Sequence, residues 1–360
     1  MSIEAAVQDQ GLVIPVPSTP GTPSPQYAHL TNISLPSQLI DFSKFLHGTA
    51  AERAATAAAI LGGFQTAGFI YLRNHAIPAS TVRAVFARSA DFFAQPLDAK
   101  TPLSLTDPAA NRGYLRQGRE KLVPPDDGRA SADSTVRKEI VELKESFEIG
   151  REPDDTYENH WPEDGAVDGF REEMMGFFAT CKDLHVQVMR AIAMGLGLEE
   201  KHFDEFVDGG DNTLRLLHYP QVRADVFKTN VGQVRAGEHC DYGSITLLFQ
   251  DSRGGLQVKA PSGAFVDATP IPDTIVVNAG DLLARWSNDT IKSTIHRVVE
   301  PPHGADVEVF PPRYSIAYFC NPNFDRLIEA MPGTYADEAD KKYEGITSGE
   351  YLFQRLAATY

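Results

Sequence analysis

The sequence has few cysteines and none of the motifs that cysteines usually form. Its three cysteines, Cys181, Cys240 and Cys320, include no CxxC pair, so neither a disulfide framework nor a cysteine zinc cluster is expected. It has no apolar run of 18 residues, and its first residues, MSIEAAVQDQ, lack the basic and apolar regions of a secretory signal. We therefore expect a cytoplasmic protein with no membrane partner.

Positive charge is also scarce. The 360 residues include 33 lysines and arginines but 49 aspartates and glutamates, which gives a net charge of −16. Such a surface repels phosphate backbones, so we expect no nucleic-acid partner, although a local basic pocket can still bind a small anion. The composition carries no information on oligomeric state.

The distribution of residue types along the chain predicts an arm followed by one large domain. Residues 11–38 contain six prolines, which is typical of an extended, loosely ordered segment. Further proline- and glycine-containing stretches predict long loops, including VPPDDGRASADSTVRK at 123–138. The predicted divisions are an arm over 1–38 and a single domain over 39–360, made of a helical half over 39–205, a β-rich core over 211–325 and a helical segment over 326–360.

Periodicity separates helices from strands within this domain. Thr49 and Glu52 have capping-box spacing ahead of an alanine-rich helix. Apolar residues from 170 to 195 follow the helical period and predict one long, core-facing helix that ends at GLG. After residue 211, short β-rich runs alternate with turns, among them NTLRLLHYP, SITLLFQD, GLQVKA, TIVVNAGDLLARWS, STIHRVVE and RYSIAYFC. This pattern is typical of a β-sandwich or barrel.

The segment HCD raises the possibility of a metal site. Along a strand, His239 and Asp241 point to one side and Cys240 to the other. A third ligand is available at His296, which follows Asp241 by 55 positions on another predicted strand. Two imidazoles and a carboxylate on one face of an octahedron form the ligand set of non-haem Fe(II) oxygenases. Zinc accepts the same ligands, and Asp241-Tyr242-Gly243 is alternatively an ordinary turn.

A second constellation lies in PPRYSIAYFCNPN. Arg313 and Ser315 share one face of this predicted strand, and Ala317, Phe319 and Asn321 continue it. An arginine inside a barrel is costly unless an anion pairs with it. A dicarboxylate can do so through a bidentate contact, with Ser315 adding a hydrogen bond, whereas an internal salt bridge is the simpler alternative.

Together these segments resemble the isopenicillin N synthase-like, Fe(II)- and 2-oxoglutarate-dependent dioxygenases. HCD, His296 and RYS match the HxD…H…RxS pattern, and GFIYLRNHAIP, KESFEIGRE, LRLLHYP and NAGDLLARWSND agree in order. The resemblance implies a mainly β fold with helical flanks: a double-stranded β-helix (jelly-roll) core with N-terminal helices and one long supporting helix. It implies that His239, Asp241 and His296 bind Fe(II), and that Arg313, Ser315 and Tyr219 bind 2-oxoglutarate. Leu217 stands where many plant members have an asparagine that contacts this co-substrate.

Alternation along the strands also suggests a substrate. If Tyr219 faces inward, Leu217 and Arg215 do too, and Arg215 then pairs with an internal carboxylate or binds polar substrate atoms. With Tyr242, Phe319 and Asn321, this set can hold a flat, carbonyl-rich ring between two aromatics. Phe319 as core and Tyr242 as a turn residue is the simpler alternative.

The resemblance is strongest to the fungal thymine dioxygenases. It implies stepwise oxidation of the thymine methyl group to 5-hydroxymethyluracil, 5-formyluracil and 5-carboxyuracil, with O₂ consumed, 2-oxoglutarate converted to succinate and CO₂, and ascorbate helpful. The substrate-binding residues implied are Arg215, Leu217, Tyr242, Phe319 and Asn321. Alternatives are a hydroxylase or desaturase of a fungal secondary metabolite, an oxidase that uses no 2-oxoglutarate, and a receptor that only binds.

Overall fold

A large sheet is the central element of the fold. The computed structural model describes residues 39–119, 142–229, 233–300 and 307–359, so the predicted arm over 1–38 and the loop over 123–138 lie outside the described residues. The sheet has eight strands in the order β1-β2-β11-β8-β14-β5-β4-β3. In that order the strands span Leu39–Asp41, Phe69–Arg73, Thr274–Ala279, Ile245–Gln250, Arg313–Cys320, Thr213–Tyr219, Glu145–Gly150 and Gly113–Leu115.

A smaller sheet faces this one and completes the jelly-roll. Its four strands run in the order β10-β9-β12-β7. They span Phe265–Asp267, Leu256–Lys259, His296–Val298 and Ala236–His239. Two further strand pairs form separate two-stranded sheets, β6 (Val222–Arg223) with β13 (Val309–Phe310), and β15 (Leu327–Ile328) with β16 (Ile346–Thr347). The mostly β fold with helices that the sequence predicted is confirmed.

The two faces of strand β14 pack against different cores. Ile316, Tyr318 and Cys320 belong to the large core between the sheet and the helices. Of the alternate residues, Ala317 belongs to the smaller core between the two sheets and Phe319 packs against it. Because side chains of a strand alternate between its faces, the RxS pair is directed into the space between the sheets.

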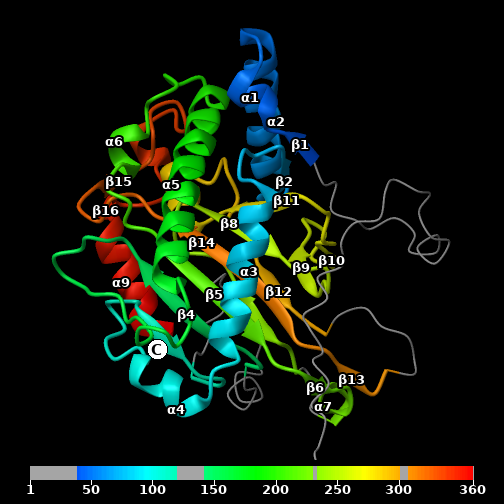
Figure 1. Ribbon diagram of the computed structural model, residues 1–360. Helices are drawn as coiled ribbons and strands as arrows, with labels where there is room; N and C mark the ends of the chain where they lie inside the picture. Colours follow the sequence, from blue (N-terminus) through cyan, green and yellow to red (C-terminus); the bar gives the residue numbers. More distant parts are fainter. Residues whose placement is uncertain (1–38, 120–141, 230–232, 301–306, 360) are drawn as a thin grey trace, which may run out of the picture. The chain divides into compact units, whose positions relative to one another are not determined.

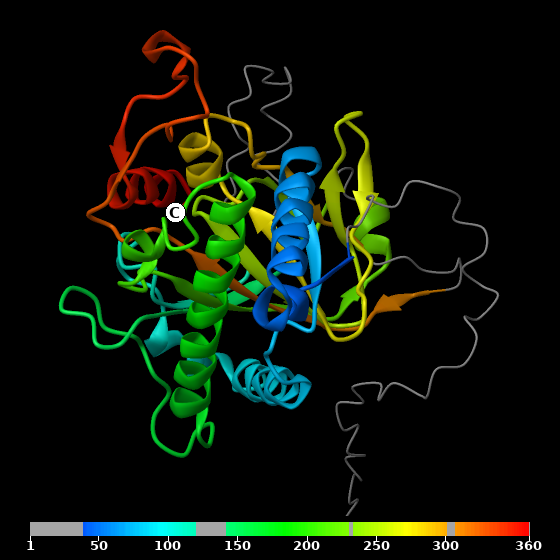
Figure 2. The same cartoon turned by 90° about the horizontal axis from the view of Figure 1, so that it is seen from above.

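Helices cover the outer face of the large sheet (Figure 1). Seen from above in Figure 2, α5 and α2 lie side by side along it, and the two helices are in contact. The α-helices α1 to α9 span Ser43–His47, Ala50–Thr66, Ala79–Phe93, Leu97–Lys100, Phe170–Gly195, Asp204–Val207, Asp225–Thr229, Asp281–Trp286 and Ser348–Thr359. Short 3₁₀ turns occupy Thr101–Leu103 and Glu338–Asp340.

The long helix predicted from 170 to 195 is present as α5 with those bounds. The predicted capping box is also present, because the Thr49 side chain accepts from the Glu52 amide and the Glu52 side chain accepts from the Thr49 amide. One expectation was wrong: the run TIVVNAGDLLARWS is a strand only as far as Ala279 and continues as helix α8. Gly280 in an extended conformation ends the strand, and the following Asp-Leu-Leu-Ala favours helix with an acidic first turn.

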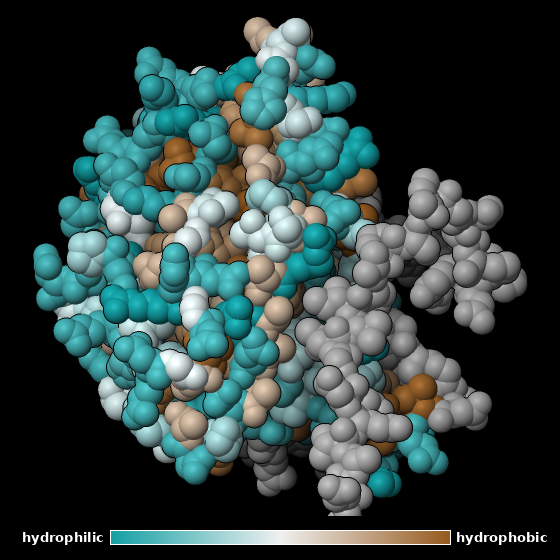
Figure 3. Space-filling view, in the orientation of Figure 1, coloured by the Kyte–Doolittle hydropathy of each residue, from teal (hydrophilic) through white to brown (hydrophobic). Residues whose placement is uncertain are grey.

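The visible surface is mostly hydrophilic, with apolar areas between the helices (Figure 3). Among the described residues, no helix combines the length and the hydropathy needed to cross a bilayer.

Candidate metal centre and adjoining cavities

His239, Asp241 and His296 come together between the two sheets. One ligand atom from each lies within 4.8 Å of the others. Asp241 Oδ1 is 3.9 Å from His239 Nε2 and 3.7 Å from His296 Nε2. Ligand atoms that bind one ion at about 2.1 Å each cannot be more than about 4.2 Å apart, so these two separations fit a single ion. Strand pairing brings the histidines together, because His296 of β12 is the direct partner of His239 of β7.

Other contacts orient each of these three side chains. His239 Nδ1 is 2.8 Å from the Gly237 carbonyl and His296 Nδ1 is 3.2 Å from the Thr294 carbonyl. Nδ1 must carry the proton to donate to a carbonyl, which leaves each Nε2 with a lone pair for a metal.

The Asp241 carboxylate is oriented in the same way. Its Oδ2 accepts hydrogen bonds from Thr246 Oγ1 at 2.5 Å and from Asn278 Nδ2 at 2.7 Å. Oδ1, the oxygen that faces the two histidines, is thereby directed toward the space between them. Strand β7 ends at His239, so Asp241 lies in the loop that follows, and strand alternation was not the reason for its direction.

Charge balance also favours a cation here. Burial lowers the pKa of His239 to about 4, and neighbouring His296 adds to this shift, so the imidazole is neutral near pH 7. Burial opposes ionisation of Asp241, but His296, His239 and the hydrogen bonds from Asn278 and Thr246 outweigh it and lower its pKa. One carboxylate and two imidazoles form the donor set that suits Fe(II). Cys240 is not part of this group.

A cavity beside the metal centre, here called the Arg313 cavity, contains the predicted co-substrate residues. Its lining includes Leu217, Tyr219, Arg313 and Ser315 together with the three candidate metal ligands. Arg313 is buried and donates to the Gly254 carbonyl at 2.9 Å, to Ser315 Oγ at 3.1 Å and to Gln250 Oε1 at 3.4 Å. These partners are all uncharged, so no internal salt bridge of the described residues neutralises Arg313.

A second buried arginine, Arg235, was not anticipated from the sequence; it is close enough to Arg313 to be affected by its charge, but it is not among the residues that line the cavity. It is fully buried, and among the described residues no atom accepts a hydrogen bond from any of its three side-chain nitrogens. Burial, followed by the positive charge of Arg313, lowers the pKa of Arg235 to about 10. Arg313, which lines the cavity and has no carboxylate partner among the described residues, fits a site for a dianion such as 2-oxoglutarate, and the nearby charge of Arg235 adds to the attraction for an anion.

Lys144 also lines the Arg313 cavity, and the sequence analysis missed it. It precedes β4, whose pairing with β5 sets Ser146 beside Leu217, so Lys144 lies level with Tyr219. A Glu142 carboxylate oxygen is 3.0 Å from its Nζ. Only the pairing of β4 with β5 reveals this position, because strand alternation of KESFEIG alone does not say which face is inside.

A second cavity, here called the Tyr242 cavity, also borders the metal centre, because His239 and Asp241 line it. Arg215, Tyr242, Phe319 and Asn321 line it, as the substrate prediction requires, and it shares Arg215, Phe319, His239 and Asp241 with the Arg313 cavity. Leu217 lines only the Arg313 cavity, so the structure places it with Arg215 and Phe319 but not with Tyr242 and Asn321.

Arg215 combines the two roles that the sequence left open. Its Nε lies 2.6 Å from the carboxylate of fully buried Glu148, and its guanidinium lies 5.1 Å from the centroid of the Phe319 ring. Arg215 is therefore paired with an internal carboxylate and still borders both cavities. The Glu148 contact and the Phe319 ring fix the direction of the guanidinium.

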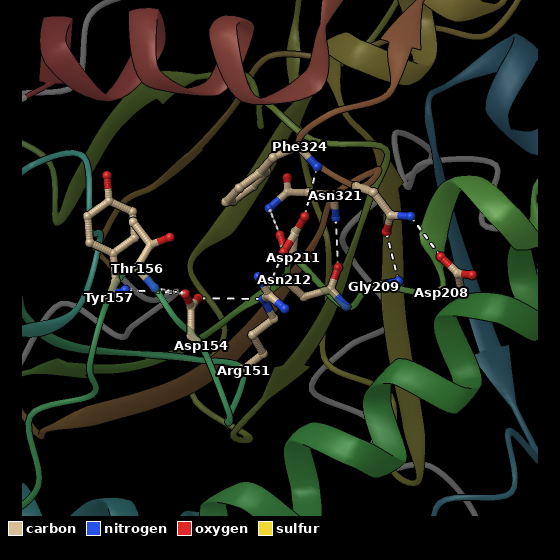
Figure 4. Close-up of polar contacts among 12 residues, drawn as sticks. Arg151, Asp154, Thr156, Tyr157, Asp208, Gly209, Asp211, Asn212, Asn321 and Phe324 are labelled. Atoms are coloured by element: carbon tan, nitrogen blue, oxygen red, sulfur yellow. Dashed lines mark hydrogen bonds and ion pairs between the residues drawn. The ribbon is translucent and has the colours of Figure 1, made fainter.

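Asn321 is held by the segment that precedes β5 (Figure 4). Its backbone amide donates to Asn212 Oδ1 at 2.8 Å, and its side-chain Nδ2 donates to the Asp211 carbonyl at 2.8 Å. Asp211 is in turn 2.9 Å from Arg151 Nε. This network fixes the Asn321 amide at the wall of the Tyr242 cavity.

The chain belongs to the 2OG-Fe(II) oxygenase superfamily. The model of that superfamily matches residues 210–322, and a second model, the non-haem dioxygenase in morphine synthesis N-terminal region, matches residues 38–164. A 2-oxoglutarate-Fe(II) type oxidoreductase, ppzD of Metarhizium rileyi, is 34% identical over 326 residues, which cover 89% of this chain and 90% of that protein. The proline hydroxylase buaE of Petromyces alliaceus is 35% identical, over 89% of this chain and 98% of that protein. The protein is therefore a non-haem Fe(II), 2-oxoglutarate-dependent dioxygenase.

Solved structures give a more specific likeness. The thymine 7-hydroxylase of Neurospora crassa in complex with alpha-KG and thymine is 60% identical, with a TM-score of 0.83, and the match covers 90% of this chain and 97% of that one. The same enzyme in complex with alpha-KG and 5-formyluracil has a TM-score of 0.80. A 2OG-Fe(II) oxygenase family protein from Caulobacter crescentus is 29% identical with a TM-score of 0.74.

Proposed function

We propose that the protein oxidises the methyl group of thymine in steps, to 5-hydroxymethyluracil, 5-formyluracil and 5-carboxyuracil, while 2-oxoglutarate is converted to succinate and CO₂. The observation that carries the proposal is the Tyr242 cavity, in which two aromatic residues, an arginine and an asparagine border the candidate metal centre. A flat pyrimidine with two carbonyl groups matches those walls in shape and polarity. The likeness to an enzyme crystallised with thymine supports the same assignment.

We assign Fe(II) to His239, Asp241 and His296, where it supplies the oxidising chemistry when bound together with O₂ and 2-oxoglutarate; ascorbate is expected to help keep it ferrous. Arg313 and Ser315 hold the distal carboxylate of 2-oxoglutarate, and Tyr219 contacts the same molecule. Buried, preorganised donors lose little freedom when the anion binds, which favours affinity. The Arg313 cavity shares walls with the Tyr242 cavity, so both molecules reach the same metal.

The remaining residues orient the ring. Tyr242 and Phe319 stack against its faces, and Arg215 donates to a ring carbonyl while Glu148 keeps its guanidinium in place. Asn321, held by Asp211 and Asn212, offers its amide to the ring edge. Their combined effect is to direct the methyl group toward the metal and to exclude water from it.

The test is a reaction under air with thymine, Fe(II), ascorbate and 2-oxoglutarate, followed by mass spectrometry. We expect 5-hydroxymethyluracil first and the more oxidised products later, with one equivalent of succinate formed in each oxidation step, so one, two and three equivalents accompany the alcohol, the aldehyde and the carboxylate. Uracil, which lacks the methyl group, is the matched control and should give none of these products. An enzyme that forms no 5-hydroxymethyluracil, and no succinate above the thymine-free background, would refute the proposal.

A second candidate is the hydroxylation of another small metabolite. Curated relatives that are 34% and 35% identical include an oxidoreductase and a proline hydroxylase. The two candidates are distinguished by the rate of succinate formation with each substrate. A higher rate with a proline-containing substrate than with thymine favours the second candidate.

We also propose a cytoplasmic location. It is supported by the three cysteines, which are all buried and free, as is usual in reducing compartments. Imaging of a fluorescent fusion tests this proposal.

A further inference from the structure

Helix α9, red in Figure 1, forms one wall of the Tyr242 cavity. Leu352, Leu356 and Thr359 of this helix line the cavity, at intervals of four and three residues that place them on one face. The helix is far in sequence from Tyr242, which follows the candidate metal ligand Asp241 directly. Its role in the site was not apparent from the sequence.

Two side chains of α9 contact Tyr242 itself. The Tyr242 hydroxyl lies 2.9 Å from Thr359 Oγ1. Because Thr359 Oγ1 donates to the Arg355 carbonyl at 3.0 Å, it is available as the acceptor and Tyr242 is the donor. The Arg355 guanidinium lies 4.8 Å from the centroid of the Tyr242 ring, a cation–π distance. One end of the tyrosine and one of its faces are therefore fixed by the same helix.

The helix is in turn tied to the segments that carry the candidate metal ligands. Asp281 lies 3.9 Å from Arg355 Nη2 and accepts from the Tyr351 hydroxyl at 3.1 Å. The same carboxylate accepts from Ser293 Oγ at 2.6 Å, three residues before His296. Its backbone amide donates to the Asp241 carbonyl at 2.8 Å. Asp281 thus connects α9 with both segments that converge on the metal centre.

We propose that α9 positions the Tyr242 ring for stacking on the substrate, with Thr359 and Arg355 as positioning residues. The inference rests on the proposed use of the Tyr242 cavity for the substrate ring. Arg355 is not among the residues that line this cavity, so it acts through Tyr242 rather than on the substrate. A ring held in advance loses less rotational freedom on binding, which raises affinity for a flat ligand without affecting the Arg313 cavity.

The experiment compares Thr359→Val, Thr359→Ser and Arg355→Met with the wild type. The measurements are KM for thymine, KM for 2-oxoglutarate, and succinate formed per thymine oxidised. We expect Thr359→Val to raise KM for thymine about fivefold, the equivalent of one hydrogen bond. Arg355→Met should raise it about three- to tenfold. Thr359→Ser keeps the hydroxyl and should stay within about twofold of the wild type, and KM for 2-oxoglutarate should not change in any variant.

Two controls separate positioning from general damage to the helix. Gln354→Met changes an exposed residue of the same helix and should leave both KM values unchanged. Tyr242→Phe removes the donor, so adding Thr359→Val to it should raise KM for thymine no further. An equal effect of Thr359→Val in both backgrounds, or an unchanged KM in Thr359→Val and Arg355→Met, overturns the inference. A wild type that forms no thymine product overturns the proposed function, and this inference with it, before any variant is compared.

Discussion

Replacing Arg235 by methionine should have opposite effects on the free protein and on its complex with 2-oxoglutarate. In the free protein, three buried side-chain nitrogens have no acceptor among the described residues. A buried polar group left without a partner costs about 1–3 kcal/mol, and more when it is charged. Arg235→Met keeps much of the side-chain volume and removes this cost, so we expect the free energy of unfolding to rise by about 1–3 kcal/mol.

The complex should respond in the other direction. If the charge of Arg235 contributes to binding the distal carboxylate beside Arg313, Arg235→Met should weaken the binding of 2-oxoglutarate. The expected increase in Kd is about tenfold, which corresponds to about 1.4 kcal/mol. At a ligand concentration of about 100 times the wild-type Kd, the ligand stabilises the wild type by about 2.7 kcal/mol. The variant, at about ten times its own Kd, gains only about 1.4 kcal/mol. The ligand-induced rise in Tm should therefore be about half that of the wild type.

Thermal melts with and without 2-oxoglutarate, under anaerobic conditions with Mn(II), measure both effects, and calorimetry gives Kd directly. Arg223→Met is the matched control, because Arg223 is exposed and pairs with Asp225 at the surface, where removal changes stability little. A variant that melts lower than the wild type without ligand, yet binds 2-oxoglutarate equally well, would show that Arg235 is a structural residue. Contact with the Phe310 ring, 6.0 Å from its guanidinium, would then be its role.

Three other substitutions test separate parts of the site and core. Asn278→Ala removes a buried hydrogen bond to Asp241 and should weaken metal binding about 10- to 100-fold in a Co(II) titration, while a melt of the metal-free protein measures separately the loss of about 1–3 kcal/mol expected for a buried hydrogen bond. Phe147→Ala removes a fully buried ring and should lower the free energy of unfolding by about 3–5 kcal/mol in urea titrations, while a loss below about 1 kcal/mol would contradict the packing argument. Arg215→Met leaves the Glu148 carboxylate without the arginine 2.6 Å away and should cost about 3–5 kcal/mol in the same titrations. Adding Glu148→Gln should restore most of that stability but no thymine turnover, and restored turnover would mean that Arg215 has only a structural role.

Local sequence patterns predicted those parts of the fold that depend on one segment at a time. The bounds of α5 follow from helical periodicity, because its buried residues recur every three or four positions. The capping box at Thr49 needs only the hydroxyl and the glutamate three residues later. The direction of Arg313 and Ser315 follows from alternation within β14.

The parts that were missed depend on pairing between distant segments. Lys144 lies on the face of this segment opposite the apolar Phe147 and Ile149, and only the register between β4 and β5 shows that this polar face borders a cavity. Arg235 lies next to β7, where the pairing with β12 is irregular between His296 and Val298, so alternation does not assign its side. The structure places the predicted metal, co-substrate and substrate residues around the metal centre and its two cavities, with Leu217 in the Arg313 cavity alone, and their roles stay predictions until binding is measured.

The register of one strand pair determines both cavities. In β14 and β5, Arg313 is opposite Tyr219, Ser315 is opposite Leu217 and Ala317 is opposite Arg215. Six residues separate Arg313 from Phe319, about 20 Å at 3.3 Å per residue, so a single strand extends from the co-substrate end to the substrate end. A slip of one residue would turn all of these side chains to the helical face, where Ile316 and Tyr318 now pack. Burial of the apolar residues on that face therefore fixes the register that directs the binding residues into the two cavities.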